Sequence, residues 1–297
     1  MIKIDLVKKI ISLILPVSFL KFYLSIKLFI SDYSFISKLA QLNRKIIKNI
    51  ELEDDEYQNL KEFLVDIPNE NRIYVDIGAA DGVNASTTLQ LAKKDDWSGY
   101  VFDSGSISEL SYLYRNFKHI NIGKTKVTPN NVNKLLNGFE VNKNFGFLNL
   151  DIDSYDFEVI KSILESGFSP FVISMEINEK IPPPIKFHVK YKDNFELSGN
   201  HFYGCSISSA FDLLNDHNFL LKHLNKNNAL FLNRKYFNLE GQDVESAYKD
   251  GYVKLKNRKE VFYYNKDMDE LLNLEKSDAI NFINHKFRNY KDNYFIE

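Results

Sequence analysis

The sequence predicts an α/β protein built on an open, mainly parallel sheet with helices on both faces. From about residue 72, short β-branched runs alternate with helical stretches six or seven times, which is typical of such sheets. The last two strand-like runs, 220–225 and 228–233, are separated by only two residues. Because a parallel crossover needs a dozen or more residues, these two strands must form an antiparallel hairpin. We therefore expect seven strands, with this hairpin closing the sheet.

The expected elements follow in chain order. Strands are expected at 72–78, 99–104, 119–124, 145–153, 171–178, 220–225 and 228–233. Helices are expected at 85–94, 127–136, 154–167 and 208–218. Asn84 is a suitable N-cap for the first helix, Thr128-Pro129 suits the first turn of the second, and Gly167 ends the third.

Composition excludes several classes of protein. Lys and Arg number 38 against 40 Asp and Glu, a net charge of −2, so no nucleic-acid partner is expected. A chain with 44% hydrophobic and 26% charged residues is neither wholly disordered nor a multi-span membrane protein. The single cysteine, Cys205, excludes internal disulfides and Cys-based zinc clusters and favours a reducing, cytoplasmic setting.

Residues 1–50 form an apolar, basic and helical N-terminal segment. Its longest uncharged run, 10–20, ends at Lys21 and is shorter than a membrane span of about 20 residues. No small-residue cleavage site follows it. We expect peripheral contact of residues 1–30 with the inner face of a membrane, where the lysines meet lipid headgroups. Packing on the chain's own domain or on a partner, and a true span, are the alternatives.

The remaining chain divides into a main domain, 51–238, and a helical C-terminal appendage, 239–297. The appendage carries many aromatic residues among balanced charges, and 269–287 has the pattern of an amphipathic helix. We expect it to pack on the main domain or to form a contact between copies in a homo-oligomer.

The loop after the first strand is a candidate cofactor site. It reads Asp76-Ile77-Gly78-Ala79-Ala80-Asp81-Gly82, and its glycines allow a tight turn and close approach to a ligand. Position 80 is alanine, so the loop departs from the G-x-G-x-x-G spacing of nicotinamide-binding folds. It matches D-x-G-x-A-x-G, a loop that binds S-adenosylmethionine. The alternative is a plain left-handed turn after a buried strand.

Asp103 ends the second strand, 25 residues after Gly78. Ligands of such sheets bind beyond the carboxyl ends of the strands, and a carboxylate there accepts both ribose hydroxyls of an adenosine group. Asp103 is therefore the candidate ribose-binding residue.

Acidic residues also follow the fourth and fifth strands. Alternation places Asp151 and Asp153 on one side of the chain, and the fifth strand adds Glu176. Three such carboxylates cannot all be ionised and unpaired. They are candidates to ligate Mg²⁺, a hard cation, or to supply a general base for a hydroxyl group. His201 is a further candidate base, with a purely structural histidine as the alternative.

Four segments resemble the FkbM-type methyltransferases: VDIGAADG, WSGYVFD, FLNLDIDSYDFEVIKSIL and FVISMEIN. The resemblance covers about residues 72–233. It implies the Rossmann-like fold of class I S-adenosylmethionine-dependent methyltransferases, with Asp76, Gly78, Ala80 and Gly82 in the cofactor loop and Asp103 on the ribose. The chain departs from the family in its N-terminal segment and beyond residue 238.

The family implies transfer of a methyl group to a hydroxyl, and we expect the acceptor to be a small molecule, a sugar, a glycan or a lipid-linked saccharide. The lipid-linked form rests only on the N-terminal segment. One alternative is a metal-dependent glycosyltransferase that uses Asp151-Ile152-Asp153 as a D-x-D motif. The other is a binding protein that has the fold without the activity.

Overall fold

The computed structural model describes residues 55–80, 87–94, 97–105, 110–111, 114, 117, 119–194 and 201–297. The chain divides into two compact units, 1–55 and 56–297, and the account below concerns the second. The predicted membrane-contacting segment, Asp81 and Gly82 lie outside the described residues. Within the described part of the chain, no helix has the length and apolar character needed to cross a bilayer.

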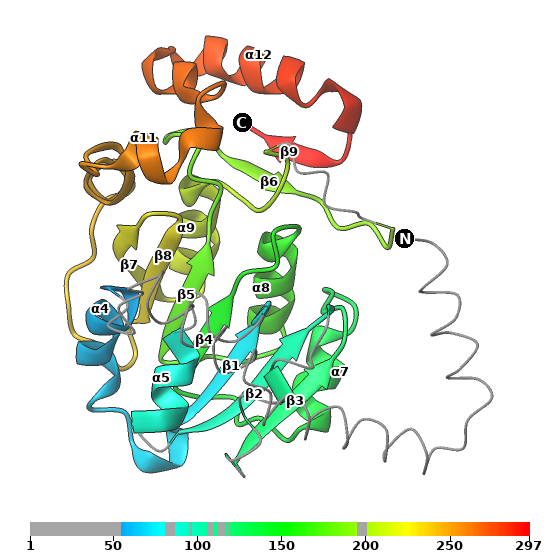
Figure 1. Cartoon of the computed structure of the whole chain (residues 1–297), viewed down its shortest axis with the longest axis vertical. Coiled ribbons are helices and arrows are strands. Elements are labelled where there is room, and N and C mark those ends of the chain that lie inside the picture. Colours follow the sequence, from blue (N-terminus) through cyan, green and yellow to red (C-terminus); the bar gives the residue numbers. More distant parts are fainter. Residues whose placement is uncertain are drawn as a thin grey trace, which may run out of the picture. The chain divides into compact units, whose positions relative to one another are not determined.

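A seven-stranded sheet forms the centre of this unit (Figure 1). Its strands are β1 Ile73–Ile77, β2 Ser98–Asp103, β3 Ile120–Lys124, β4 Phe147–Leu150, β5 Val172–Glu176, β7 Phe219–Asn225 and β8 Asn228–Asn233. They lie in the order β3-β2-β1-β4-β5-β8-β7. β8 runs antiparallel to both β5 and β7, and the other neighbours are parallel. The predicted Rossmann-like class I methyltransferase fold, with its closing hairpin, is thus confirmed.

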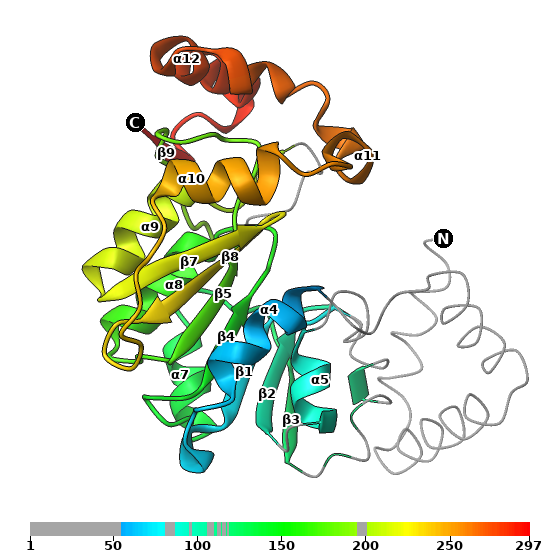
Figure 2. The ribbon, with the colours of Figure 1, turned by 90° about the vertical axis from the view of Figure 1, so that its left-hand side faces the viewer.

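Helices cover both faces of the sheet (Figure 2). They are α4 Asp55–Leu64, α5 Thr87–Lys94, α7 Val132–Gly138, α8 Asp156–Glu165 and α9 Ile207–Asp216. Side chains of α7, α8 and α9 share one buried apolar cluster with Val75 and Ile77. Those of α4 and α5 share another with Tyr74 and Val101. The central strands are therefore apolar on both faces, as parallel strands between two helical layers must be.

The second predicted helix begins later than expected. We predicted 127–136, but α7 spans Val132–Gly138. The amide of Thr128 donates to Asn131 Oδ1 (2.7 Å), and the amide of Asn131 donates to the Thr128 carbonyl (3.1 Å). Thr128-Pro129 therefore forms a turn before the helix instead of its first turn.

The C-terminal segment is a series of short helices. They are α10 Val244–Tyr248, η2 Lys249–Val253, α11 Arg258–Val261, η3 Tyr263–Asn265, η4 Asp269–Asn273, α12 Lys276–Lys286 and η5 Arg288–Tyr290. The single amphipathic helix predicted over 269–287 is wrong: Leu274 and Glu275 are extended, with ψ of 145° and 153°. The chain therefore forms η4 and α12 on either side of this break.

A second, two-stranded sheet joins the chain after β5 to the C-terminal end. β6 Phe187–Val189 pairs antiparallel with β9 Tyr294–Ile296, and neither strand was predicted. Around them lies a third apolar cluster, which includes Phe187, Phe202, Ile283 and Phe287. The segment after residue 238 thus packs within the same compact unit as the seven-stranded sheet.

Candidate functional site

The loop after β1 turns sharply beside the end of β4. Gly78 has φ +93°, and its amide donates to the Phe102 carbonyl of β2 (2.9 Å). A Cβ at this position would lie 1.6 Å from the carbonyl oxygen of Asp151. Ala80 also has a left-handed backbone, with φ +48°, and is exposed. Glycine is required at position 78 because any side chain there would overlap the backbone of Asp151.

Asp103 forms hydrogen bonds to both the loop after β1 and the loop after β2. Its Oδ2 accepts from the Ala80 amide (2.9 Å), and its Oδ1 accepts from the Gly105 amide (2.6 Å). A carboxylate offers about four lone-pair sites, so two further donors can bind to it. The structure therefore places the predicted ribose-binding carboxylate at the carboxyl end of β2 with its orientation fixed by two backbone amides.

Asp76 lies in the interior. It is 2% exposed, and its carboxylate accepts from Thr88 Oγ1 of α5 (2.5 Å) and Asn149 Nδ2 of β4 (2.9 Å). Burial raises its pKa, which these two hydrogen bonds partly offset. Among the described residues of the predicted loop, Gly78 and Ala80 lie beyond the carboxyl end of β1, whereas the Asp76 side chain connects β1 to α5 and β4.

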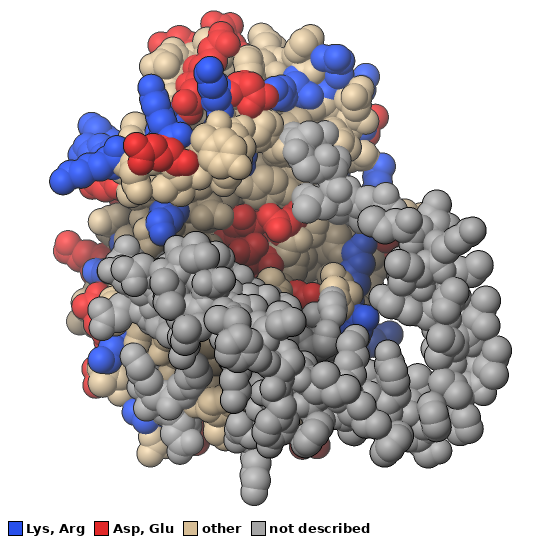
Figure 3. Space-filling view, in the orientation of Figure 1, with Lys and Arg blue, Asp and Glu red and all other residues tan. Residues whose placement is uncertain are grey.

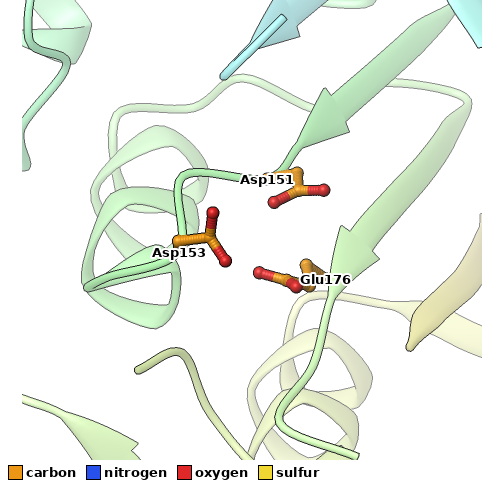
Figure 4. A group of neighbouring side chains, drawn as sticks. All are labelled: Asp151, Asp153 and Glu176. Atoms are coloured by element: carbon orange, nitrogen blue, oxygen red, sulfur yellow. The ribbon is translucent and has the colours of Figure 1, made fainter. Parts of the chain in front are cut away.

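Asp151, Asp153 and Glu176 come together at the carboxyl ends of β4 and β5 (Figure 4). Each offers a carboxylate oxygen, and these oxygens all lie within 4.8 Å of one another. Asp151 directly follows β4, Glu176 is the last residue of β5, and Asp153 sits at φ +53° in the loop between β4 and α8. Figure 3 shows acidic side chains gathered in a hollow below the C-terminal helices. We call Asp151, Asp153 and Glu176 the acidic cluster.

Burial raises the pKa values of all three residues of the acidic cluster, and repulsion within the cluster adds to the rise at Asp151 and Glu176. The pKa of Asp151 rises to about 7, first through burial and then through the charges of Asp156 and Asp153. Glu176 is 5% exposed, and its pKa lies well above the usual range for the same reasons. A hydrogen bond between the two carboxyl groups lowers the pKa of Asp151 and raises that of Glu176. Of the two carboxyl groups, Glu176 is the one whose pKa their shared hydrogen bond raises.

One oxygen of Glu176 has no hydrogen-bond donor. Asn227 Nδ2 donates to Glu176 Oε1 (2.9 Å), whereas no donor from the described residues reaches the buried Oε2. A buried carboxyl oxygen without a donor is costly. It is satisfied when it carries the proton shared with Asp151, or when it binds a cation.

Asp156 shapes the loop that carries Asp153. Its side chain is fully buried and accepts from the amides of Ile152 (2.9 Å) and Ser154 (3.1 Å). Burial raises its pKa to about 6 despite these bonds. It holds Asp153 in its left-handed conformation and has a structural role.

A buried charged network behind the acidic cluster was not anticipated. Glu179 and Lys180 are both buried and form an ion pair (3.0 Å). Tyr203 OH donates to Glu179 Oε2 (3.0 Å) and accepts from Lys180 Nζ (2.5 Å). The Lys180 charge lowers the pKa of Asp153, against the rise caused by burial. An adjacent Glu and Lys directly after an apolar strand were the sequence signal for this network.

His201 does not belong to the acidic cluster. Its Nε2 lies 3.0 Å from Asp267 Oδ1 in the C-terminal segment, and Lys286 also pairs with Asp267. Burial lowers the pKa of His201, and Asp267 opposes that shift. The partner of this predicted base is thus a carboxylate, and the geometry fits a residue that links segment 201–205 to Lys286 of α12 through Asp267.

No family model matches the chain, and no curated protein matches it. Solved structures that it resembles include the O-methyltransferase NcsB1 from neocarzinostatin biosynthesis, in complex with S-adenosylmethionine and 2-hydroxy-5-methyl naphthoic acid. That match has 12% identity over 60% of this chain and 55% of that chain, with a TM-score of 0.33.

Two further solved structures are similar to the chain. The pyocyanin biosynthetic protein PhzM matches at 12% identity over 69% of this chain and 60% of its own, with a TM-score of 0.37. The CurJ carbon methyltransferase matches at 10% identity over 56% and 49%, with a TM-score of 0.36. The chain thus spans less than two thirds of each of these structures. The fold assignment rests on the strand order and directions of its own sheet.

Proposed function

We propose that the chain is an S-adenosylmethionine-dependent methyltransferase that methylates a hydroxyl group of a sugar, a glycan or a lipid-linked saccharide. The observation that carries this proposal is the position of Asp103. It lies at the carboxyl end of β2, is held by amides of the loops after β1 and β2, and keeps lone pairs for two ribose hydroxyls. The strand order around it is that of class I methyltransferases. We also propose that the chain is a member of the FkbM-type family.

Methyl transfer is an in-line displacement. Bound S-adenosylmethionine would supply an electrophilic methyl group for the hydroxyl oxygen, with S-adenosylhomocysteine as the leaving group, and a residue of this chain would take the hydroxyl proton. Alignment of the two reactants accounts for much of the catalysis, up to about 7–11 kcal/mol in favourable cases. Asp151 suits the base, because its pKa of about 7 makes it an effective proton acceptor at neutral pH.

Alternatively, the acidic cluster fits a divalent cation, in which case Asp151 is a ligand instead of the base. Asp151, Asp153 and Glu176 are oxygen ligands of the kind that Mg²⁺ prefers, and Glu176 Oε2 is buried without a donor. A bound Mg²⁺ would lower the pKa of an acceptor hydroxyl. The three carboxylates would hold the ion, and Asp156 would keep the loop of Asp153 in place.

The test is calorimetric titration of the full chain with S-adenosylmethionine and S-adenosylhomocysteine, with Mg²⁺ or with EDTA. We expect micromolar binding of both compounds. Addition of Mg²⁺ should raise the midpoint temperature of thermal unfolding of the wild type and leave that of Glu176→Gln unchanged. Glu165→Gln, at the exposed end of α8, is the control and should behave as the wild type does. A folded protein that binds neither compound would exclude the methyltransferase proposal.

A glycosyltransferase is the second candidate, because the carboxylates of the D-x-D motif Asp151-Ile152-Asp153 meet Glu176 in one cluster. Binding of a sugar nucleotide with Mn²⁺, without affinity for S-adenosylmethionine, would favour it. Cofactor binding without turnover on any hydroxyl acceptor would instead favour a non-catalytic binding protein.

We further propose that residues 1–30 attach the protein to the inner face of a membrane. The lysines and apolar residues of that segment support this. Co-flotation of the full chain with vesicles that contain anionic lipid tests it, and failure to float would remove the argument for a lipid-linked acceptor.

A further inference from the structure

A cavity of about 690 Å³ lies between the C-terminal segment and the chain that follows β6. Its lining comes from residues 190–194, from Phe202, from Tyr290 and Asn293 near the C-terminus, and from Asn130 before α7. This volume lies within the usual range for small-molecule sites. Asp103 and the acidic cluster do not line it, so the cofactor site and base proposed above leave it without a role.

One wall of the cavity is aromatic and firmly supported. Phe202 and Tyr290 stack with ring centroids 4.1 Å apart and an interplanar angle of 8°. Phe202 also makes edge contacts with Phe187 and Phe287. Tyr191 lines the cavity as well. Rigid aromatic faces suit the C–H face of a sugar ring, since they are flat and apolar with polar edges.

Asn293 lines the cavity and carries an unsatisfied acceptor. Its backbone is fixed, because its amide donates to the Tyr290 carbonyl (2.9 Å) and its carbonyl accepts from the Lys190 amide (2.8 Å). Its side-chain Oδ1 is buried and has no partner in the described part of the chain. A buried polar atom of this kind calls for a ligand donor or a water, and a sugar hydroxyl supplies such a donor.

The charge of the lining is positive. Lys190 and Lys192 are exposed at the cavity, and its one carboxylate, Asp193, already accepts from Tyr191 OH (2.6 Å). Two cations against one hydrogen-bonded carboxylate favour a ligand with an anionic group.

The cavity also adjoins the loop of the acidic cluster. The Tyr191 ring packs edge-on against Tyr155, with centroids 4.8 Å apart, and Tyr155 lies two residues after Asp153. On the other side, Tyr203 follows Phe202 in the chain and bonds to Lys180. Segment 202–204 thus contacts both places, because Phe202 lines the cavity and the Gly204 amide donates to the Ser154 carbonyl (2.7 Å) in the loop of the acidic cluster.

We propose that this cavity is an acceptor subsite that binds a sugar ring carrying a phosphate or carboxylate group. The ring packs against Tyr290, which Phe202 supports from behind, a hydroxyl donates to Asn293 Oδ1, and Lys190 and Lys192 face the anionic group. This assignment rests on the proposed methyltransferase function, in which it defines the class of acceptor.

The test measures binding directly and needs no turnover. The full chain is titrated by calorimetry and by ligand-observed NMR with glucose 1-phosphate, glucuronate, glucose and inorganic phosphate. We expect at least one anionic sugar to bind about ten-fold more tightly than glucose and than inorganic phosphate. The two anionic sugars distinguish a phosphate from a carboxylate. Equal binding of glucose, or equal binding of inorganic phosphate, would overturn the proposal.

Two sets of variants locate the binding. Lys190→Gln with Lys192→Gln should weaken binding of the anionic sugar about ten-fold and leave glucose unchanged, and Asn293→Leu should weaken both about five-fold. Lys256→Gln with Lys276→Gln is the matched control, because both lysines are exposed and lie outside the cavity. Unchanged sugar binding in the lysine variant would overturn the proposal, even if Asn293→Leu fails to fold.

Titration with S-adenosylhomocysteine separates this inference from the proposed function. We expect its Kd to be the same in the cavity variants as in the wild type. Weaker cofactor binding in these variants would mean that the cavity holds the adenosine group, which overturns the subsite. Cofactor binding without any sugar binding would overturn the subsite and leave the methyltransferase proposal standing. Sugar binding without cofactor binding would overturn the methyltransferase proposal and the acceptor role, and would leave only a sugar-binding site.

Discussion

Gly78 meets two separate requirements, a left-handed backbone and the close passage of another segment. Its φ is +93°, and an added Cβ would overlap the Asp151 carbonyl oxygen at 1.6 Å. The amide of Asp151 in turn donates to the Ile77 carbonyl (2.9 Å). A side chain at position 78 would therefore push apart the ends of β1 and β4 and displace a residue of the acidic cluster.

We predict that Gly78→Ala lowers the free energy of unfolding by more than about 3 kcal/mol, because backbone strain and overlap act together. Urea denaturation measures this. Gly167→Ala isolates the strain, since Gly167 has φ +81° and open space around it, and should cost about 1 kcal/mol. Gly138→Ala, which has neither feature, should be neutral or slightly stabilising. Equal stability of the first two variants would contradict the predicted overlap.

We predict that Asp103→Ala weakens S-adenosylhomocysteine binding by about 1–3 kcal/mol, or roughly 5- to 150-fold. The variant removes the acceptor for the Ala80 and Gly105 amides as well as for the ribose. Calorimetric titration measures the change, and Asp216→Ala at the exposed end of α9 is the control. Wild-type affinity in the Asp103 variant would exclude the ribose role.

At the scale of elements, the sheet of β6 and β9 is packed around a histidine, His188, that stacks between two aromatic rings. His188 of β6 stacks between Phe157 (4.0 Å between centroids) and Phe295 of β9 (5.1 Å). Its pKa falls to about 4, first because of burial and then because of the charges of Lys161 and Lys190. The stack therefore joins α8, β6 and β9 through a ring whose neutral form is favoured by burial, with Glu158 Oε1 3.8 Å from its Nε2.

The lowered pKa predicts a loss of stability in acid. Between the ordinary pKa of 6.5 and the folded value of about 4, the unfolded chain binds a proton at His188 that the folded protein does not bind. The stabilising contribution is thus complete above pH 6.5 and declines as pH falls towards 4, by about 2–3 kcal/mol in all. We predict that His188→Phe removes this component from urea denaturation measured between pH 4 and 7, whereas the exposed His285→Gln retains it. An unchanged pH dependence in His188→Phe would refute the assignment.

At the scale of the whole molecule, the segment after residue 238 completes the core of the second unit. Tyr248, Tyr252 and Phe262 belong to the same apolar cluster as the central strands. Tyr248 OH donates to the Glu179 carbonyl (2.6 Å), and Asn265 Nδ2 donates to Glu179 Oε1 (2.6 Å). Residues after β8 therefore hold the charged network behind the acidic cluster.

We predict that a chain ending at residue 238 does not unfold cooperatively. Each large apolar side chain withdrawn from the core is worth about 1.5–3 kcal/mol, and several together exceed the typical net stability of about 5–15 kcal/mol. Thermal unfolding followed by circular dichroism tests this. A chain ending at residue 293, which loses only β9, should retain a cooperative transition at a lower temperature. A cooperative transition at the wild-type temperature in the shorter chain would show that the segment is dispensable.

The sequence predicted the sheet well because its signals are local. β-branched runs, helical periodicity and the two-residue connection at Lys226 and Asn227 each lie within a few residues, and together they specify seven strands and the closing hairpin. Carboxylates that directly follow strands must gather at one edge of a parallel sheet, which is why Asp151 and Glu176 were found. The strands β6 and β9 were missed, because three-residue strands far apart in the chain leave no periodic pattern. The break at Leu274 was missed because the apolar periodicity continues across it.

The sequence by itself therefore determined the fold class, the closing antiparallel hairpin and the edge of the sheet where acidic residues and glycines meet. Only the tertiary structure decided the role of each residue there. It turned Asp76 inward to Thr88 and Asn149, paired His201 with Asp267 and assembled the cavity from residues 130, 190–194, 202, 290 and 293. The physical reason is that hydrogen-bond partners and cavity walls come from segments distant in the chain, and no local pattern of residues specifies which of them will meet.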